Sequence, residues 1–305
     1  MEESQIDIRP YIEAFFIHRT VPRYFLSPVY LAHDPAHFLQ ERDGCLVVLR
    51  SRMYMGQPVL YAVLPPISLS GDLGVEMYVM MDLLEHGIGI RLSDEDIDIY
   101  RPGYAYYFED IAKWKFVPKH EADEYVYRCG DYLSLDGDRF KHERRTMHIA
   151  DREKVGYTRE RHVGDYVQRT FADWYAKRGV AKSQGRILRA WNELDRPGSF
   201  ILQVPGVGFS MNEPISDKGF IVPLRLREYD SHLLPRPTSY MHIVDMCYWA
   251  ELFGPDALMN YGGAVGVKGL KEAKESLRPH RLLRIYHVQP TYKLTADEWR
   301  EVRPR

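Results

Sequence analysis

Several classes of protein are excluded by what this 305-residue sequence lacks. Its three cysteines are odd in number, far apart and without a CxxC pair, so they supply neither a disulfide framework nor metal-ligand spacing. The longest apolar run, Met77–Leu84, contains Asp82 and is far shorter than the roughly 20 residues that span a bilayer. The N-terminus is acidic where an export signal needs basic residues. We therefore expect a cytoplasmic protein without a metal site or a transmembrane segment.

The charge is nearly balanced over the whole chain but not along it. The formal net charge is −2, yet residues 72–131 carry 14 acidic and 6 basic side chains, and residues 139–189 carry 14 basic and 6 acidic ones. A basic second half predicts a polyanionic partner such as RNA, CoA or an acidic lipid. The alternative is that these side chains are solvated faces of helices.

The hydrophobic pattern predicts an α+β protein. Apolar and charged residues make up 45% and 28% of the chain, as in globular proteins, and the length allows two domains. In the first half we expect strands over 25–32, 45–50, 59–64, 97–100 and 104–108, and a helix over 77–86. In the second half we expect helices over 138–150, 163–177, 186–194 and 240–253, and strands over 200–204, 207–211 and 220–224.

The order of elements in the second half resembles the Gcn5-related N-acyltransferase (GNAT) fold. Helices come first, then an antiparallel meander, then helix, strand, helix and strand. The two halves have similar sizes but no sequence repeat. We therefore predict a tandem of GNAT-like domains over 1–128 and 129–305, each with a mixed, mostly antiparallel sheet flanked by helices.

Residues 257–288 combine an apolar run, a glycine loop, a basic helix and a β-rich run. A helix that begins after such a loop presents backbone N–H groups to anionic ligands. On a helical wheel Lys274 falls within the apolar stripe formed by Val267, Leu270, Ala273 and Leu277. Its side chain must therefore either snorkel to water or face a cleft, and the cleft interpretation makes it a catalytic candidate.

The helix predicted over 240–253 carries a second candidate. Asp245 lies within its apolar stripe, where a carboxylate is costly unless it is paired. It is either a base with a raised pKa or half of a structural ion pair, for example with an arginine of the meander. The same wheel places His242 off the stripe, as a surface histidine. It places Trp249 on the surface as well, where the ring could stack on a base or lie at a domain interface.

A match to the acyltransferase phosphate-binding signature is discounted. Residues 203–208 read QVPGVG, but Pro205 removes one N–H and strand-like residues follow. We predict a β-hairpin turn here. Ser210, Asn212 and Glu213, at the end of the following strand, are predicted to contact substrate.

Three stretches resemble the C-terminal catalytic domain of phosphatidylglycerol lysyltransferases. Residues 124–150 (EYVYRCGDYLSLDGDRFKHERRTMHIA) are similar to its tyrosine-rich strand, DLxxLxG segment and basic helix. Residues 208–213 (GFSMNE) are similar to its FSIGE strand end, with Asn212 in place of glycine. Residues 260–286 are similar to its NRExDLGxxGLRKAKxSxRP segment, but Gly262, Gly263 and Ala264 stand where that family usually has acidic residues.

The resemblance implies transfer of an aminoacyl group from aminoacyl-tRNA to an amine or hydroxyl of a small metabolite, a peptide or a lipid. No cofactor is implied beyond the aminoacyl-tRNA co-substrate. By resemblance Lys274 is catalytic, and Arg278 and Asn260 contact substrate. Lys141, Arg144, Arg145 and Lys271 are the predicted RNA contacts, with a solvated helix face as the alternative for Arg144 and Arg145.

Two other functions remain open. An N-acyltransferase of the same fold could take its acyl group from acyl-CoA. A non-catalytic RNA-binding protein is conceivable because the acidic residues of the family are replaced by glycine and alanine. Transfer from charged tRNA, transfer from a pantetheine thioester, and RNA binding without turnover distinguish the three.

Overall fold

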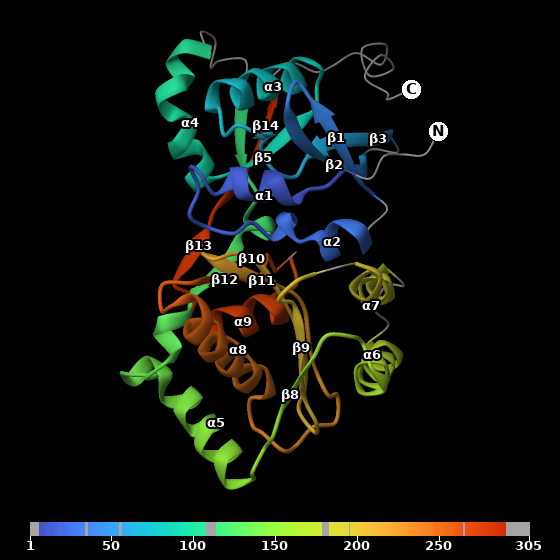
Figure 1. Ribbon diagram of the computed structural model, residues 1–305, viewed down its shortest axis with the longest axis vertical. Helices are drawn as coiled ribbons and strands as arrows, with labels where there is room; N and C mark the ends of the chain where they lie inside the picture. The colour runs from blue at the N-terminus through green and yellow to red at the C-terminus, as the bar shows by residue number, and fades with distance from the viewer. Residues whose placement is uncertain are drawn as a thin grey trace. The chain divides into compact units, whose positions relative to one another are not determined.

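The computed structural model describes residues 6–33, 36–54, 57–107, 114–178, 183–194, 196–264 and 266–290 (Figure 1). Contacts divide the chain into two compact units. Unit 1 consists of Met1–Thr20, Pro35–Asp123 and Leu283–Arg305, and unit 2 consists of Val21–Asp34 and Glu124–Leu282. The linear division into 1–128 and 129–305 is therefore corrected. A strand near the C-terminus completes the sheet of unit 1, and a segment near the N-terminus packs into unit 2.

Unit 1 is built on a mixed sheet. Its strand order is β1-β2-β3-β5-β14-β6, with β4 paired to β2. The strands are β1 (His37–Arg42), β2 (Cys45–Tyr54), β3 (Gln57–Ala62), β4 (Ile67–Ser68), β5 (Gly89–Ser93), β6 (Trp114–Pro118) and β14 (Ile285–Pro290). Only the β3–β5 pair is parallel among the described strands of this sheet, and α3 (Leu73–Glu85) connects its two members.

The helices of unit 1 differ from the sequence prediction at one point. The predicted strands over 97–100 and 104–108 are wrong, because α4 (Asp94–Tyr107) occupies this segment as far as residue 107. Ser93 and Asp96 form a reciprocal cap, in which the Asp96 N–H donates to Ser93 Oγ at 3.1 Å and the Ser93 N–H donates to Asp96 Oδ2 at 2.8 Å. Such a cap and three acidic residues in the first turn favour a helix despite the internal Pro102. The other described helix of this unit is α1 (Arg9–Phe15).

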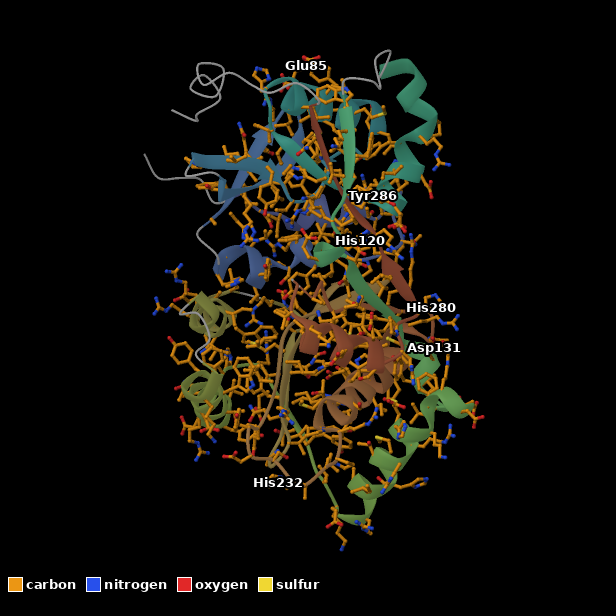
Figure 2. The ribbon with its side chains drawn as sticks, turned by 180° about the vertical axis from the view of Figure 1, so that it is seen from behind. Glu85, His120, Asp131, His232, His280 and Tyr286 are labelled. Atoms are coloured by element: carbon orange, nitrogen blue, oxygen red, sulfur yellow. The ribbon has the colours of Figure 1, made fainter. Side chains whose placement is uncertain are left out.

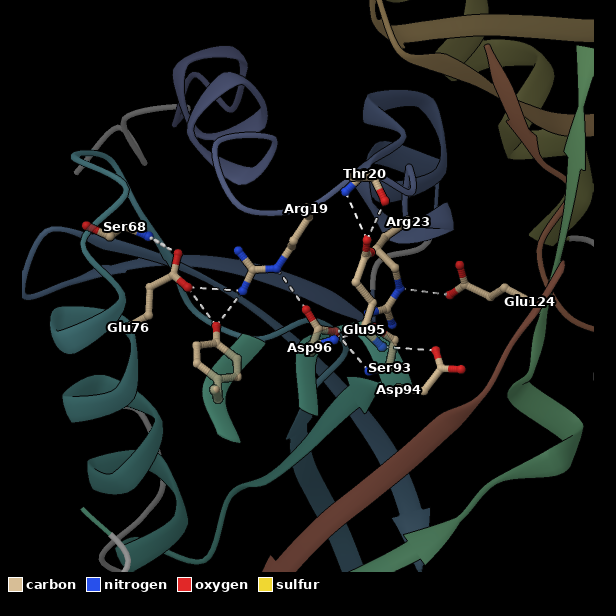
Figure 3. A network of polar contacts seen from close by, with 11 residues as sticks. Arg19, Thr20, Arg23, Ser68, Glu76, Ser93, Asp94, Glu95, Asp96 and Glu124 are labelled. Atoms are coloured by element: carbon tan, nitrogen blue, oxygen red, sulfur yellow. Dashed lines mark hydrogen bonds and ion pairs between the residues drawn. The ribbon is translucent and has the colours of Figure 1, made fainter. Parts of the chain in front are cut away.

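A buried arginine, Arg19, forms ion pairs with residues of both α3 and α4 in unit 1 (Figure 3). Arg19 Nε donates to Asp96 Oδ1 at 2.8 Å, and its NH2 donates to Glu76 Oε2 at 3.0 Å. The hydroxyl of Tyr100 donates to the same Glu76 oxygen at 2.6 Å. All three charged side chains are at least 99% buried, so each depends on the others for compensation of its charge.

Unit 2 repeats the same plan. Its sheet has the order β13-β7-β12-β11-β10-β9-β8. The strands are β7 (Glu124–Arg128), β8 (Thr158–Glu160), β9 (Phe200–Val204), β10 (Gly208–Ser216), β11 (Gly219–Arg227), β12 (Leu258–Asn260) and β13 (Arg281–Leu283). The β11–β12 pair is parallel and is connected by α8 (Pro237–Phe253), as α3 connects β3 to β5. The predicted α+β class is confirmed.

Helices cover both faces of the sheet in unit 2 (Figure 1). Alternate residues of β9, such as Phe200 and Leu202, join the core under α5 (Lys141–Arg152) and α8, whereas Ile201 joins the core under α6 (Asp165–Arg178) and α7 (Ser183–Glu193). Burial on both faces explains why β9 (FILQV) is largely apolar, whereas β8 (TRE), at the edge of the sheet, is exposed. The predicted strand over 25–32 is wrong, because this segment forms a 3₁₀ turn, Tyr24–Leu26, and α2 (Pro28–His33). The remaining helix is α9 (Lys268–Ser276).

Candidate active site

The parallel strands β11 and β12 of unit 2 diverge, and buried polar side chains gather where they do. Their pairing ends at Ile221 and Asn260. Beyond it, the Tyr24 hydroxyl donates to the Pro223 carbonyl at 2.9 Å, so the N-terminal segment of this unit covers the free edge of β11. The buried ionisable groups of unit 2 include Glu124, Glu213, Arg225, His242, Asp245 and Lys274. Burial shifts the pKa values of Glu213, His242, Asp245 and Lys274, and such groups in one region mark a candidate functional site.

Asp245 is half of an ion pair. Arg225 NH2 donates to Asp245 Oδ2 at 2.7 Å, and both side chains are fully buried. Ser210 donates to the same oxygen at 2.7 Å, and Asn212 donates to the other oxygen at 3.0 Å. Burial raises the pKa of Asp245, and the charge of Arg225 opposes the rise. Of the two interpretations of Asp245, the structure supports the ion pair with an arginine of the meander, because both carboxylate oxygens are occupied.

The sheet register explains how this cluster assembles. Ser210 on β10 lies directly opposite Arg225 on β11, and Asn212 follows two residues later on the same face. The helix α8 packs against this face and brings Asp245 to it. Arg225 was missed by the sequence analysis. The available signal was a single arginine between Leu224 and Leu226 in an otherwise buried strand.

Two predictions for α8 are wrong. His242 is completely buried and its Nδ1 lies 3.1 Å from Arg225 NH1, so burial and that charge lower its pKa well below the usual value. Trp249 is also completely buried and stacks on Phe220 and Phe253 at 4.8 and 5.1 Å between ring centroids. The helical wheel assumed one solvated face, whereas α8 packs between the sheet and α5 and is buried nearly all round.

Lys274 is buried inside unit 2, although Val267 and Ala273 of its predicted apolar stripe are exposed. Its ammonium donates to the carbonyl oxygens of Gly262 at 3.0 Å and Gly263 at 2.8 Å, and also to that of Tyr261. Burial lowers the pKa of Lys274 to about 7; the charge of Glu124 opposes this decrease and that of Arg225 adds to it. The side chain neither snorkels to water nor points its N–H groups into an open cleft. It clamps the glycine loop that precedes α9.

Asn260 holds the other side of this loop. Its amide nitrogen donates to Glu124 Oε2 at 2.5 Å and to the Pro22 carbonyl at 2.6 Å, and its oxygen accepts from the Gly262 N–H at 2.7 Å. Arg23 Nε lies 3.4 Å from the same carboxylate. Both N–H groups of the predicted substrate ligand are therefore used inside the protein, which makes Asn260 a positioning residue.

Two of the three motif stretches contact one another in the structure. Tyr127 on β7 donates to the Lys274 carbonyl at 2.8 Å, and Tyr132 donates to that of Leu277. These carbonyls end α9, where the helix leaves acceptors unsatisfied. Asp131 and His280 lie together in Figure 2, with Asp131 Oδ2 3.8 Å from His280 Nδ1. The tyrosine-rich strand thus caps the helix that carries Lys274.

Glu213 is a buried acid of this unit with an incompletely paired carboxylate, as is Glu143. Ser27 donates to its Oε2, whereas Oε1 has no hydrogen-bond partner among the described residues. Burial raises the pKa of Glu213 to about 7, against the hydrogen bond from Ser27 and the charge of Arg196. Near neutral pH this carboxyl is therefore able both to accept and to release a proton.

The shifted pKa of Glu213 predicts a pH-dependent stability. In the unfolded chain the carboxyl titrates near 4.5, and in the folded chain near 7. Between these pH values the folded state binds more protons than the unfolded state, so the free energy of unfolding decreases as pH rises. This destabilisation is complete above pH 7. Glu213→Gln is expected to be more stable than wild type above pH 7, by up to about 3 kcal/mol.

Urea unfolding from pH 4 to 8 measures this effect. The stability difference between Glu213→Gln and wild type should decrease toward zero as pH falls to 4.5. Glu251→Gln, on the exposed part of α8, controls for the loss of a negative charge. A difference between Glu213→Gln and wild type that does not change with pH would show that Glu213 is not the titrating group.

The predicted RNA contacts lie away from this buried cluster. Lys141, Arg145 and Lys271 are exposed, and Lys271 Nζ is 3.8 Å from Glu275 on the same helix. Arg144 is half-buried and donates to the Gly137 carbonyl at 2.8 Å, so it orders the loop before α5. Arg278 is exposed, and its Nε donates to the Arg139 carbonyl at 3.4 Å.

The QVPGVG segment is a hairpin turn, as predicted. It connects β9 to β10, and the Val207 N–H donates to the Val204 carbonyl at 2.9 Å. Within the part of the chain that the structure describes, no group of histidine, cysteine or acidic side chains could hold a metal ion. In that same part no helix is long and apolar enough to cross a membrane.

Comparison with known proteins gives structural matches. A conserved protein of unknown function from Bacteroides thetaiotaomicron is 18% identical, with a TM-score of 0.67 over 93% of this chain and 97% of that one. L-PGS from Bacillus licheniformis is 11% identical, with a TM-score of 0.62 over 95% of each chain. The C-terminal domain of a putative lysylphosphatidylglycerol synthetase from Agrobacterium fabrum is 12% identical, with a TM-score of 0.61 over 97% and 95%. This chain shares the fold of these synthetase domains.

The family resemblance predicted from the three motif stretches is thereby confirmed at the level of the fold. No protein-family model matches the chain, and no curated protein matches it in sequence. The synthetase structures match nearly their whole length, so both units of this chain take part in the likeness.

Proposed function

We propose that this protein transfers an aminoacyl group from aminoacyl-tRNA to an amine or hydroxyl of a small metabolite, a peptide or a lipid. The likeness to L-PGS, which extends over 95% of both chains, is the observation that carries this proposal. The name of the related synthetase describes the joining of a lysyl group to phosphatidylglycerol. The same fold here supports an acyltransferase, and the motif stretches favour an aminoacyl donor.

The reaction requires one proton transfer and no covalent enzyme intermediate. The acceptor nitrogen or oxygen attacks the ester carbonyl, a bond to the carbonyl carbon forms, and the bond to the ribose oxygen breaks. The acceptor loses a proton and the ribose oxygen gains one. Glu213 serves as the base in this proposal, because its Oε1 is unoccupied by described residues and its pKa of about 7 suits the task.

The clamped glycine loop supplies the second part of the mechanism. The first turn of α9 follows Val267, which gives no side-chain cap, so its backbone N–H groups are available to an oxyanion. Lys274 and Asn260 set the position of this turn through the carbonyl and N–H groups of residues 261–263. Their role is to position the loop rather than to touch substrate.

Two features count against the acyl-CoA alternative. The two amides of a pantetheine arm could pair with the backbone of the diverging strand β11. Pro223 has no N–H, however, and its carbonyl already accepts from Tyr24. The segment before α8 (228–236) also contains no glycine, and Pro237 begins the helix, so its first turn lacks one N–H for a pyrophosphate.

Donor assays decide among the three functions. The protein is incubated with a pool of tRNA charged with labelled amino acids and with extracts that contain amines and lipids. Ribonuclease-sensitive movement of label to an acceptor is the expected result. Label that moves only from an acyl-pantetheine thioester would replace the proposal with the acyl-CoA reaction, and RNA binding without turnover would replace it with a binding function.

A further inference from the structure

Two adjoining cavities at the β8 edge of unit 2 lie outside the buried cluster described above. The first has a volume of about 240 Å³ and the second about 420 Å³, and both are lined by Arg161 and Ser199. Arg196 lines the first cavity, and Arg159 and Tyr248 line the second. We refer to these two cavities, defined by the five residues named, as the β8 cleft.

Two arginines of the β8 cleft rest on aromatic rings. The guanidinium carbon of Arg159 lies 4.0 Å from the ring centroid of Tyr248, and that of Arg196 lies 3.7 Å from the centroid of Trp191. A guanidinium whose face rests on a ring, as that of Arg159 does, can direct its N–H edge toward oxygen acceptors. Such preorganised forks match the geometry of phosphate.

Ser199 provides a second, independent observation. Ser199 is only 5% exposed, and its hydroxyl has no hydrogen-bond partner among the described residues. A buried hydroxyl without a partner is costly, and this one borders both cavities. A ligand oxygen in the β8 cleft would satisfy it.

The charge of the β8 cleft selects an anion. Among the described lining residues, Arg159, Arg161 and Arg196 contribute three positive charges and Glu193 contributes one negative charge. His162 and Asn192 complete the polar lining of the first cavity. Arg159 and Arg161 also belong to the basic segment of the sequence, over 139–189, for which a polyanionic partner was predicted.

The β8 cleft is also close to Glu213. The charge of Arg196 acts on the Glu213 carboxyl, and Gly198 lies against Pro214, with 3.2 Å between an added Cβ and the proline Cγ. A phosphate bound by Arg161 and Ser199 would therefore lie beside the strand end that carries the proposed base.

We propose that the β8 cleft binds a backbone phosphate of the single-stranded 3′ end of RNA. The identity of the ligand as RNA rests on the proposed function, whereas the anion site rests on the cleft itself. Arg159 and Arg161 contact phosphate oxygens, the Ser199 hydroxyl donates to one of them, and the Tyr248 ring keeps the Arg159 guanidinium in place.

Binding of uncharged RNA tests this proposal without any transfer reaction. Fluorescence anisotropy follows a labelled, short single-stranded RNA ending in CCA at several salt concentrations. Arg159→Gln with Arg161→Gln is expected to weaken binding at least tenfold and to lower the log–log salt slope by about 1.4, because two phosphate contacts are lost. Both arginines are exposed, so folding should be unchanged by circular dichroism.

Two further variants sharpen the test. Ser199→Ala removes only the unpartnered hydroxyl and is expected to weaken binding several-fold with the fold intact. Arg101→Gln with Lys115→Gln removes the same charge from exposed positions of unit 1 and is expected to change binding less than twofold. Equal binding by wild type and the Arg159/Arg161 variant would overturn the proposal.

The remaining outcomes identify the source of the phosphate and distinguish a failure of the cleft proposal from a failure of the proposed function. Binding of inorganic phosphate or a mononucleotide in the β8 cleft, without binding of the RNA, would overturn the RNA assignment. RNA binding that depends on the cleft, in a protein that never transfers label from charged tRNA, would support the cleft and reject the proposed function. If the Arg159/Arg161 variant transfers label and binds RNA as wild type does, the proposal for the β8 cleft is rejected and the proposed function is kept.

Discussion

Arg225→Met is expected to lower the free energy of unfolding by about 3–5 kcal/mol, because it leaves the carboxylate of Asp245 buried without its cation. Ser210 and Asn212 still donate to this carboxylate, but neither neutralises its charge. His242 also loses the group that its Nδ1 contacts. Urea unfolding at pH 7, followed by far-UV circular dichroism, measures the loss.

Two controls make the result specific to the buried charge. Arg225→Met combined with Asp245→Asn removes both charges, keeps the shape of the carboxyl, and is expected to recover most of the lost stability. Arg101→Met breaks an exposed pair with Asp98, in which the side chains are 71% and 68% exposed, and should change stability by less than about 0.5 kcal/mol. A double variant as unstable as Arg225→Met would show that the arginine acts through packing instead.

Lys274→Met is expected to reduce the proposed transfer reaction by roughly 100- to 1,000-fold, because displacement of a reacting group by about 1 Å is enough for such a loss. The variant removes the donors to the carbonyls of residues 261–263, so the loop before α9 loses its clamp. Folding should persist with a decrease of about 1–3 kcal/mol, since acceptors are left unsatisfied while a costly buried charge is removed. Transfer from charged tRNA measures the first effect and urea unfolding the second.

Hydrogen exchange distinguishes positioning from a general loss of structure. In Lys274→Met the N–H groups of Tyr261 and Gly262 should exchange faster, whereas those of the β9–β10 hairpin should be unchanged. Lys268→Met removes a lysine that is 91% exposed from the same helix and is expected to keep transfer within twofold of wild type. Transfer at the wild-type rate by a folded Lys274→Met protein would remove the clamp from the mechanism.

The sequence determined features that a local pattern records. Lys274 and Asp245 were recognised because each is a charged residue among apolar positions of a helix, although Val267 and Ala273 of the α9 stripe are exposed and α8 is buried on more than one face. Period-2 patterns and turn residues located the β9–β10 hairpin and indicated that QVPGVG is not a phosphate loop. The three motif stretches indicated the fold through their resemblance to the lysyltransferase domain.

Tertiary structure alone decided which groups meet. Arg225 reaches Asp245 because strand register sets it opposite Ser210, and register depends on long-range pairing that one strand does not encode. His242 and Trp249 are buried because α8 is covered on several sides, a fact that belongs to its neighbours and not to its own sequence. For the same reason Val21–Asp34 belongs to unit 2 and β14 to unit 1, although each segment is far along the chain from most of its unit. The environment of a side chain depends on all the segments packed around it, whereas a local sequence pattern describes only one of those segments.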